Sequence, residues 1–387
     1  MTRVLLICNL FDDKWVGSLV RSLKKQDPAL QIEIFNTHIQ KNVPWPAYTA
    51  LCAQIYAGKR HAFSVLYKIP KIRTFLWNID IYWGFHKWIK LQKEKYDVIN
   101  LHYLLPIFKH CISDLSRGAN TVLLSPWGSD VLRVKKRTLK KLMILVKRMD
   151  YVSCDKAQIR FQNDIADLLH VSENKWIHLG FGTEMIDVIN RSTQFTREQA
   201  KEKMGLSAYY IVVCGYNGHK AQNHLKIIEA IATKKECLPK NLLLLFPMTY
   251  GGEETYMAHV EKKIKSYGFS YQILRHYLSN ENLLLVRKCA DIFIHAQETD
   301  ANSGTLAEYL LCRTKIINGS WLAYPHREKY GKPYYEFDHF DQLGKLMVQV
   351  YHTRESLIDD RLVLEIAQMG WEKMGKQWVD FYHSCAK

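Results

Sequence analysis

The chain alternates short apolar segments with stretches that have a helical pattern of hydrophobic residues. The strand-like segments of its first half are RVLLICNLF, LQIEIFNT, YDVINLHYL, NTVLLSPWG and DYVSCD. Strands that are apolar almost throughout are buried on both faces, and strands that alternate with helices form parallel sheets. The first half therefore predicts a parallel sheet with helices on both of its faces.

A break in this alternation divides the chain. Residues 180–197, GFGTEMIDVINRSTQFTR, are polar and contain glycine, which is typical of a linker. The alternation then resumes, with strand-like segments YYIVVCGYNG, NLLLLFPMTYGG, SYQILR, DIFIHA and TKIING. We therefore expect an α/β fold with two doubly wound, Rossmann-like domains, at 1–190 and 195–365. Ligands of such sheets bind beyond the carboxyl ends of the strands, so a cleft between the two domains is the expected active site.

The bulk composition is that of a soluble globular protein. The 387 residues suffice for two domains with separate cores, and 48% of them are hydrophobic and 24% charged. No apolar run approaches the roughly 20 residues that span a bilayer, and the first residues indicate a buried strand rather than a signal peptide. None of the nine cysteines stands in a CxxC pair, which favours reduced thiols in a cytosolic protein over disulfides or zinc.

The net charge of +16 is unevenly distributed along the chain. Residues 59–95 hold nine Lys or Arg against two acids, and residues 133–148 hold eight and no acid. Such a surplus indicates an anionic partner, which can be a membrane surface, a phosphorylated substrate or nucleic acid. Both segments also carry apolar or aromatic residues, which suits an anionic bilayer surface; a core helix with a solvated basic face is the alternative. We expect no nucleic-acid partner, because no RRM, KH or zinc-finger signature is present.

Two turns in the second half have features of a phosphate site. Gly215, Asn217, Gly218 and Lys220 lie between a strand-like segment and a helix-like one. Glycine lets the backbone approach a phosphate, and the amides of a helix N-terminus attract its charge. Thr249 follows the next strand-like segment, in a turn that could line the same cleft. An ordinary strand-to-helix turn is the alternative for each.

A third turn, in HAQETDANSGTLAEYLL, contains two acids. Its small residues open the helix-like TLAEYLL and would offer free amides to a diphosphate: Asn302, Ser303, Gly304 and Thr305. Glu308 lies about one helical turn further along, where a carboxylate can accept two hydrogen bonds from a ribose. Asp300 precedes the turn. The alternative is that Asp300 only complements the helix dipole and that Glu308 is solvated.

Three polar residues that follow strand-like segments of the first half are candidates for catalysis. Asp130 lies in SPWGSDVLRV, where it could bind an acceptor, act as a base or cap the following helix. His102 lies at the end of YDVINLH, and a lone histidine is more often structural. Asp12 follows the first strand-like segment together with Asp13, and a surface position is the alternative for both.

These motifs, taken in order, resemble those of the GT-B glycosyltransferases. SPWGSDVLR is similar to a Trp-Gly-x-Asp turn of the bacterial TDP-N-acetylfucosamine:lipid II N-acetylfucosaminyltransferases, and VVCGYNGHKAQNHLKII and LLLFPMTYG resemble two further turns of these enzymes. LLLVRKCADIFIHAQETDANSGTL resembles the helix, strand and turn that follow. Family 4 glycosyltransferases also carry two glutamates with seven residues between them. Asp300 and Glu308 have this spacing, with Asp in the first position.

The resemblance runs from about residue 120 to 320 and implies roles for several residues. The first acid, here Asp300, would lie near the transferred sugar, and Glu308 would bind the donor ribose. Asn217 and Gln222 stand near positions where the family has Arg and Lys, with Lys220 as the close cation. The implied GT-B fold has two domains that face each other across a cleft. Its C-terminal helix, here 366–387, returns to the N-terminal domain.

The function that the resemblance implies is transfer of a hexose-type sugar from a nucleoside diphosphate to a lipid-linked or polysaccharide acceptor, as in lipopolysaccharide synthesis. We expect no cofactor or metal, because amides and Lys220 can neutralise the leaving diphosphate and no DxD site is evident. The expected location is cytoplasmic, on the inner face of the plasma membrane. Retention and inversion of the anomeric configuration both stay open. A nucleotide-sugar 2-epimerase of the same fold is the alternative enzyme, and a basic nucleic-acid-binding protein is the alternative outside enzymes.

Overall fold

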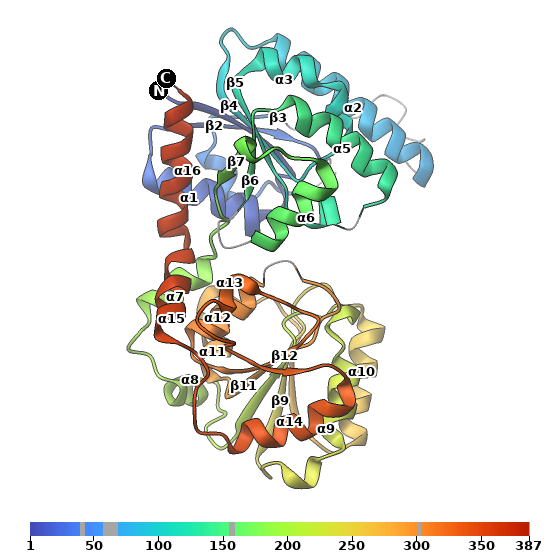
Figure 1. The fold of residues 1–387 in the computed structure, drawn as a ribbon, viewed down its shortest axis with the longest axis vertical. Coiled ribbons are helices and arrows are strands. Elements are labelled where there is room, and N and C mark those ends of the chain that lie inside the picture. Colours follow the sequence, from blue (N-terminus) through green and yellow to red (C-terminus); the bar gives the residue numbers. More distant parts are fainter. Residues whose placement is uncertain (39–42, 57–68, 133, 155–158, 301–302, 387) are drawn as a thin grey trace. The chain divides into compact units, whose positions relative to one another are not determined.

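The chain divides into two compact units, each built on one parallel sheet (Figure 1). The computed structural model describes all residues except 39–42, 57–68, 133, 155–158, 301–302 and 387, and leaves the side chains of 70–71, 159–161 and 325–326 undescribed. The first unit comprises Met1–Gly182 and Trp371–Lys387, and the second comprises Thr183–Gly370. This is the α/β architecture that the alternating pattern predicts.

The first unit has a seven-stranded parallel sheet of order β3-β2-β1-β4-β5-β6-β7. Its strands are β1 (Arg3–Cys8), β2 (Gln31–Asn36), β3 (Gln54–Tyr56), β4 (Tyr96–His102), β5 (Ala119–Ser125), β6 (Tyr151–Cys154) and β7 (Trp176–His178). The chain builds outward from β1 to β3 and then resumes at β4 on the other side of β1, where Val4 pairs with both Ile32 and Val98. The β1–β4 boundary is therefore a topological switch point, the usual ligand position of such sheets.

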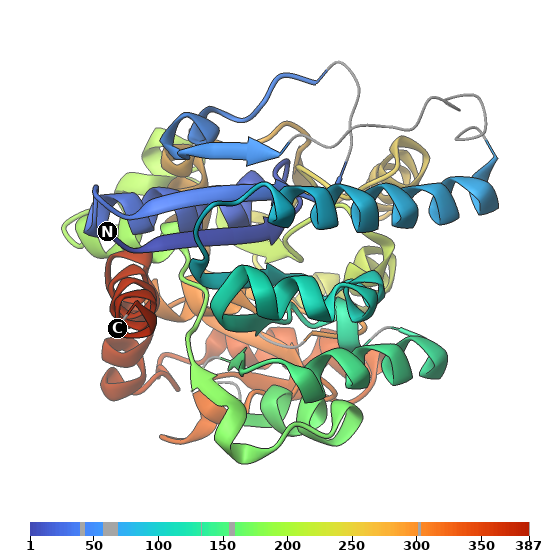
Figure 2. The same cartoon turned by 90° about the horizontal axis from the view of Figure 1, so that it is seen from above.

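Helices connect these strands. They are η1 (Asp13–Gly17), α1 (Ser18–Gln26), η2 (Ala47–Leu51), α2 (Pro70–Lys90), η4 (Pro106–His110), α3 (Ile112–Gly118), α4 (Ser129–Leu132), α5 (Lys136–Arg148), α6 (Ile159–Leu169), η5 (Glu173–Lys175) and α16 (Trp371–Cys385). Helices α2, α3 and α5 lie along one face of the unit (Figure 2), and both α2 and α5 pack against η4. Among the described residues, no helix has the length and apolarity needed to cross a membrane.

The last helix, α16, completes the first unit beside α1 (Figure 1). The two helices come close at Gly375, where an added Cβ would lie 1.9 Å from Ser22 Oγ. Tyr382 is fully buried, and its hydroxyl accepts a hydrogen bond of 2.9 Å from Asn100 Nδ2 on the central strand β4. Trp378 donates from Nε1 to the carbonyl oxygen of Gly180 at 2.9 Å. A helix distant in sequence thus anchors the core of this unit.

The second unit repeats the design with a six-stranded parallel sheet of order β10-β9-β8-β11-β12-β13. Its strands are β8 (Tyr210–Cys214), β9 (Leu242–Pro247), β10 (Ser270–Leu274), β11 (Ile292–His295), β12 (Lys315–Gly319) and β13 (Tyr335–Phe337). Its helices are α7 (Glu184–Arg191), α8 (Arg197–Lys203), η6 (Lys220–Gln222), α9 (His224–Ala232), η7 (Lys235–Cys237), α10 (Glu254–Ser266), α11 (Asn280–Cys289), α12 (Gly304–Leu311), α13 (Pro325–Glu328), α14 (Phe340–His352), α15 (Asp360–Ile366) and η8 (Ala367–Met369). The switch point here is the β8–β11 boundary.

Alternate strand residues of the second unit enter two separate cores. Val212 and Ile294 belong to the core on one face of the sheet, whereas Val213 and Phe293 belong to the core on the other. Because successive strand residues point to opposite faces, near-continuous apolar strands imply helices on both sides. Burying one such side chain contributes about 1.5–3 kcal/mol, so this double burial explains why the strands read as unbroken apolar runs.

The segment expected as a linker contains a helix. Helix α7 buries Met185, Ile186 and Ile189 against the second unit, where it packs on α11 and α12. The second unit therefore begins at Thr183 and ends at Gly370, on either side of the 195–365 expected from sequence. The polar residues around α7 make its short amphipathic pattern hard to recognise in the sequence. None of the nine cysteines forms a disulfide.

Candidate functional site

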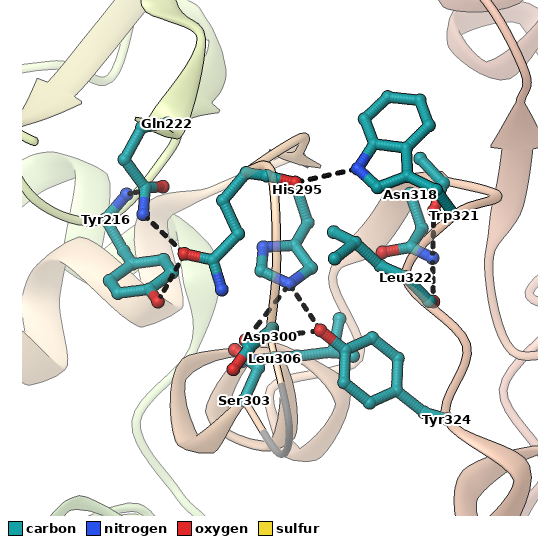
Figure 3. Close-up of polar contacts among 12 residues, drawn as sticks. Tyr216, Gln222, His295, Asp300, Ser303, Leu306, Asn318, Trp321, Leu322 and Tyr324 are labelled. Carbon is teal, nitrogen blue, oxygen red and sulfur yellow. Dashed lines mark hydrogen bonds and ion pairs between the residues drawn. The ribbon is translucent and has the colours of Figure 1, made fainter. Parts of the chain in front are cut away.

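Two loops meet at the switch point of the second unit, one after β8 and one after β11. Gln297 Oε1 accepts hydrogen bonds of 2.8 Å from both Tyr216 OH and Gln222 Nε2 (Figure 3). Asn223 Nδ2 donates to the carbonyl oxygen of Ala296 at 2.8 Å. Gln222 and Gln297 are both buried. Side chains and backbone thus fasten the two loops into one polar platform.

Glycines allow the close backbone approaches in these loops. Gly215 directly follows β8 with a φ of 67°, and an added Cβ would lie 2.9 Å from Gln222 Oε1. Gly218 donates its amide to the Tyr250 carbonyl at 2.8 Å, and an added Cβ there would lie 2.7 Å from Gly252 Cα. A side chain at Gly218 would therefore push apart the turns after β8 and β9. The sequence placed Gly215 and Gly218 in this turn, and the close approach of their backbone to a phosphate stays a prediction.

The polar residues of the β8 turn differ in exposure. Asn217 Oδ1 accepts from the amide of His219 at 2.9 Å and so shapes the turn. Lys220 is 64% exposed and forms an ion pair of 3.2 Å with Glu253. Thr249 lies half-buried in the turn after β9. Lys220 is therefore the cation of this turn that a ligand could approach from solvent.

A second polar cluster follows β11 and involves Asp300. His295 is buried at the end of β11, with Nε2 2.8 Å from Tyr324 OH and 3.6 Å from Asp300 Oδ2 (Figure 3). Tyr324 donates to Asp300 Oδ2 at 3.2 Å. Burial, and next the neighbouring Asp300, raise the pKa of Tyr324, so its hydroxyl stays protonated. If Tyr324 donates to Asp300, it accepts from His295 Nε2–H, and this chain orients the Asp300 carboxylate, whose side chain is 15% exposed.

The N-terminus of α12 is capped by Ser303, so one of the amides expected to be free for a ligand is occupied. Ser303 Oγ accepts from the amide of Leu306 at 3.1 Å, and its carbonyl accepts from Arg327 Nη2 at 3.0 Å. Gly304 and Thr305 form the first turn of α12. Asn302 lies outside the described residues. Ser303 thus occupies one amide of the helix N-terminus and ties the turn to α13.

Glu308 lies inside the unit, where it is paired with a residue that sequence reasoning missed. Its Oε2 accepts from Arg287 Nε at 2.6 Å, and the two side chains are only 7% and 5% exposed. Arg287 also donates to Tyr309 OH at 3.1 Å. The clue in the sequence was one basic residue on the buried side of α11, between Val286 and Cys289. The ion pair anchors α12 to α11, and the role of Glu308 toward a ribose stays a prediction.

In the first unit, Asp130 braces two loops at the carboxyl ends of β4 and β5. Its Oδ2 accepts from the Leu104 amide at 2.7 Å and its Oδ1 from the Trp127 amide at 2.9 Å. Burial raises the pKa of this carboxyl, and the amide hydrogen bonds oppose that rise. Asp130 therefore fixes the position of Trp127, and a role as base stays a prediction.

His102 lies at the end of β4 in an aromatic environment. Its ring centroid is 5.6 Å from that of Phe181, 6.0 Å from Trp378 and 6.4 Å from Trp127. Burial lowers its pKa to about 3, so the imidazole is neutral near pH 7. Within the described part of the chain, neither ring nitrogen has a hydrogen-bond partner.

Asp12 follows β1 at the same switch point and is half-buried. Burial is the main cause that raises its pKa, and Lys14 opposes the rise. Beside it, sequence reasoning missed an aromatic surface in which Trp15 lies 6.1 Å and Tyr103 6.0 Å from the Trp127 ring. Trp15 is 38% and Tyr103 40% exposed, and Tyr103 adopts a φ of 62°. The site chemistry of this unit is thus one partly accessible acid beside exposed rings.

Comparison with solved structures assigns the fold. Sucrose-phosphate synthase from Thermosynechococcus elongatus matches with a TM-score of 0.71 at 14% identity, over 99% of this chain and 98% of that one. HepE from Anabaena in complex with UDP and glucose matches with a TM-score of 0.67 at 11% identity, over 99% and 100%. The α,α-trehalose 6-phosphate synthase from Burkholderia multivorans matches with a TM-score of 0.69 at 10% identity, over 100% and 97%.

These neighbours define the class of fold as GT-B, the two-domain α/β fold of glycosyltransferases. Neither a protein-family model nor a curated protein sequence matches the chain. At sequence identities of 10–14%, the similarity to these solved structures establishes the fold alone. It is the GT-B fold that the sequence motifs predicted. The narrower resemblance to the N-acetylfucosaminyltransferases stays a prediction.

Proposed function

We propose that this chain is a glycosyltransferase of the hexosyltransferase class that transfers a sugar from a nucleoside diphosphate to a lipid-linked or polysaccharide acceptor, in bacterial cell-surface glycan synthesis such as lipopolysaccharide assembly. The main support is the polar platform at the β8–β11 switch point, in a fold shared with a protein solved with UDP and with UDP-glucose. Amides and amide side chains at such an edge suit a diphosphate and the hydroxyls of a nucleotide sugar.

The second unit binds the donor in this proposal. Gly215 and Gly218 let the loop backbone approach the diphosphate, and Lys220 adds positive charge. Asp300, oriented by Tyr324, accepts hydrogen bonds from hydroxyls of the transferred sugar. Glu308 reaches the ribose through Oε1, since Oε2 accepts from Arg287. Loop amides and Lys220 balance the charge of the leaving diphosphate without a metal ion.

The first unit binds the acceptor and supplies the base. The oxygen of the acceptor hydroxyl attacks the anomeric carbon of the sugar, and the nucleoside diphosphate leaves. As it does so, Asp12 takes the proton from that hydroxyl. Its raised pKa makes it a stronger base than an exposed aspartate. His102, which is a weak base because of its low pKa, and Asp130, which holds two amides, position the acceptor loops.

The acceptor also sets the proposed location. A lipid-linked acceptor requires that the enzyme work at a membrane surface, here the cytoplasmic face of the plasma membrane. The net charge of +16 and the basic helices of the first unit favour an anionic bilayer as partner.

Calorimetric titration with UDP-, GDP- and dTDP-sugars, alongside the bare nucleoside diphosphates, tests the donor site. At least one nucleotide sugar should bind. Asp300→Asn should then weaken that sugar nucleotide about tenfold and the bare diphosphate far less, because the carboxylate contacts only the sugar. Asp341→Asn, on the exposed first turn of α14, is the matched control and should bind like the parent.

Three outcomes would argue against this assignment. Binding of no nucleotide sugar would remove the donor site. An equal loss for sugar nucleotide and bare diphosphate in Asp300→Asn would remove the role of Asp300. Conversion of the donor to an epimer in the absence of any acceptor would favour the 2-epimerase.

A further inference from the structure

A groove of about 540 Å³ lies on the first unit, away from the strand ends that form its switch point. Helix α5 lines it with Lys140, Ile144 and Lys147, and the segment after α6 contributes His170 and Lys175. Among the residues that the structure describes, no acidic one lines it. The groove is therefore cationic and has an apolar component.

The cations of α5 are not balanced by neighbouring acids. Helix α5 contains no acidic residue, and no ion pair within 4.0 Å involves its lysines or arginines in the described part of the chain. By contrast, Lys201, Lys263 and Arg275 in the second unit are each paired with a carboxylate at 2.6–2.8 Å. Uncompensated charge on one helix is the electrostatic pattern of a surface that binds anions.

Lys175 lines the groove, and its ammonium group is bound to backbone carbonyls of α5. Its Nζ donates to the carbonyl oxygens of Val146 and Lys147 at 3.1 and 3.0 Å, and also to that of Met149. It thereby satisfies the C-terminal carbonyls of α5 and complements the negative end of the helix dipole. Lys140 and Lys147, two helical turns apart and both exposed, stay open to a ligand.

The apolar residues of the groove distinguish a lipid from a free anion. Ile144 lies between Lys140 and Lys147 on the same helix face and is 50% exposed. Helix α2 packs on η4 as α5 does and lies along the same face of the unit (Figure 2), and it exposes Phe75 by 64% and Trp83 by 56%. Inorganic phosphate would gain nothing from these side chains, whereas the interface of a bilayer accommodates them beside lysine.

We propose that this groove binds the phosphodiester headgroup of an anionic phospholipid, with Lys140 and Lys147 at the phosphate and Ile144 inserted at the bilayer interface. The inference rests on the proposed membrane association, and it specifies where on the chain that association occurs. It does not depend on the donor site.

Flotation with liposomes of phosphatidylglycerol and phosphatidylcholine, without donor or acceptor, tests the site in the full chain. Lys140→Ala/Lys147→Ala should lower partitioning onto phosphatidylglycerol liposomes about tenfold more than Lys136→Ala/Arg137→Ala does, because each pair loses the same charge but only the first lines the groove. Ile144→Ser, which keeps all charges, should lower it as well. Circular dichroism checks that each variant is folded.

Equal losses for the two double variants would overturn the site and indicate diffuse attraction by the basic helix. Competition of liposome binding by millimolar glycerol phosphate, with Ile144→Ser unaffected, would show a free-anion site instead. If liposome binding follows the expected order while no nucleotide sugar binds, the glycosyltransferase proposal fails and the headgroup site stands.

Discussion

The two units have the same winding but differ in what they present at the carboxyl ends of their central strands. At the β8–β11 boundary, Tyr216, Gln222 and Gln297 form hydrogen bonds to one another. At the β1–β4 boundary, a neutral histidine is enclosed by Trp127, Phe181 and Trp378. The sheet fixes where a ligand can bind, and the residues after the strands decide its chemistry. One edge suits phosphates and hydroxyls, and the other offers aromatic faces beside an acid.

The largest expected effect concerns the buried ion pair that joins α11 to α12 in the second unit. Arg287→Ala leaves Glu308 buried without its partner and should lower the free energy of unfolding of the second unit by about 3–5 kcal/mol. Lys265→Ala, which breaks an exposed pair with Glu261 on α10, should cost at most about 0.5 kcal/mol. Urea denaturation measures both. A loss below that of a typical hydrogen bond for Arg287→Ala would mean that the polar edge does not depend on this pair.

The aromatic edge should show itself in the pH dependence of stability. The pKa of His102 in the folded chain is about 3, below its usual value of 6.5, so its contribution is complete above pH 6.5 and is lost as the pH falls towards 3. Between pH 7 and pH 5, the free energy of unfolding of the first unit should fall by about 2 kcal/mol more in the parent chain than in the His102→Phe variant. Urea titrations followed by tryptophan fluorescence report this, because Trp127 and Trp378 adjoin His102. Parallel pH profiles would mean that His102 is protonated or solvated in the folded chain.

The smallest expected effect comes from removing one tyrosine hydroxyl at each of the two sheet edges. Tyr216→Phe removes a hydrogen bond to Gln297 and should lower stability by about 1 kcal/mol. Tyr103→Phe, at the aromatic edge, should change it little, because no hydrogen bond of this hydroxyl occurs in the described residues and the side chain is 40% exposed. Thermal denaturation of both variants gives the comparison. A larger loss for Tyr103→Phe would reverse the contrast drawn between the edges.

Local sequence pattern sufficed for most of the fold. Long apolar runs such as LLLLFP and YDVINLH form inner strands of the two sheets. Ser279 caps α11, with its hydroxyl accepting from the Asn282 amide. The edge strands β3, β7 and β13 were not predicted, because three residues are too few to show a period. Helix α7 was obscured by the polar residues around it.

The turns around the candidate site were predictable where the signal was local, and the contacts between distant residues were not. Glycines at 215 and 218 mark a tight turn within a few residues of β8, and the structure places both there. Ser303 stands directly before α12, where it caps the helix. The partners of Glu308 and Asp300 are Arg287 and Tyr324, each more than 20 residues away. Spacing within one segment carries no information about such contacts, which arise only when the sheet and its helices pack.

The return of α16 to the first unit also sets an order of assembly. Domains usually fold as they emerge during synthesis, N-terminal part first. Here the ribosome makes all of the second unit before the residues that complete the first. The second unit can therefore fold before Tyr382 is available to bind Asn100 in the first unit. The side of α1 that packs against α16 is uncovered during that interval, and it would stay uncovered in any product truncated before Trp371.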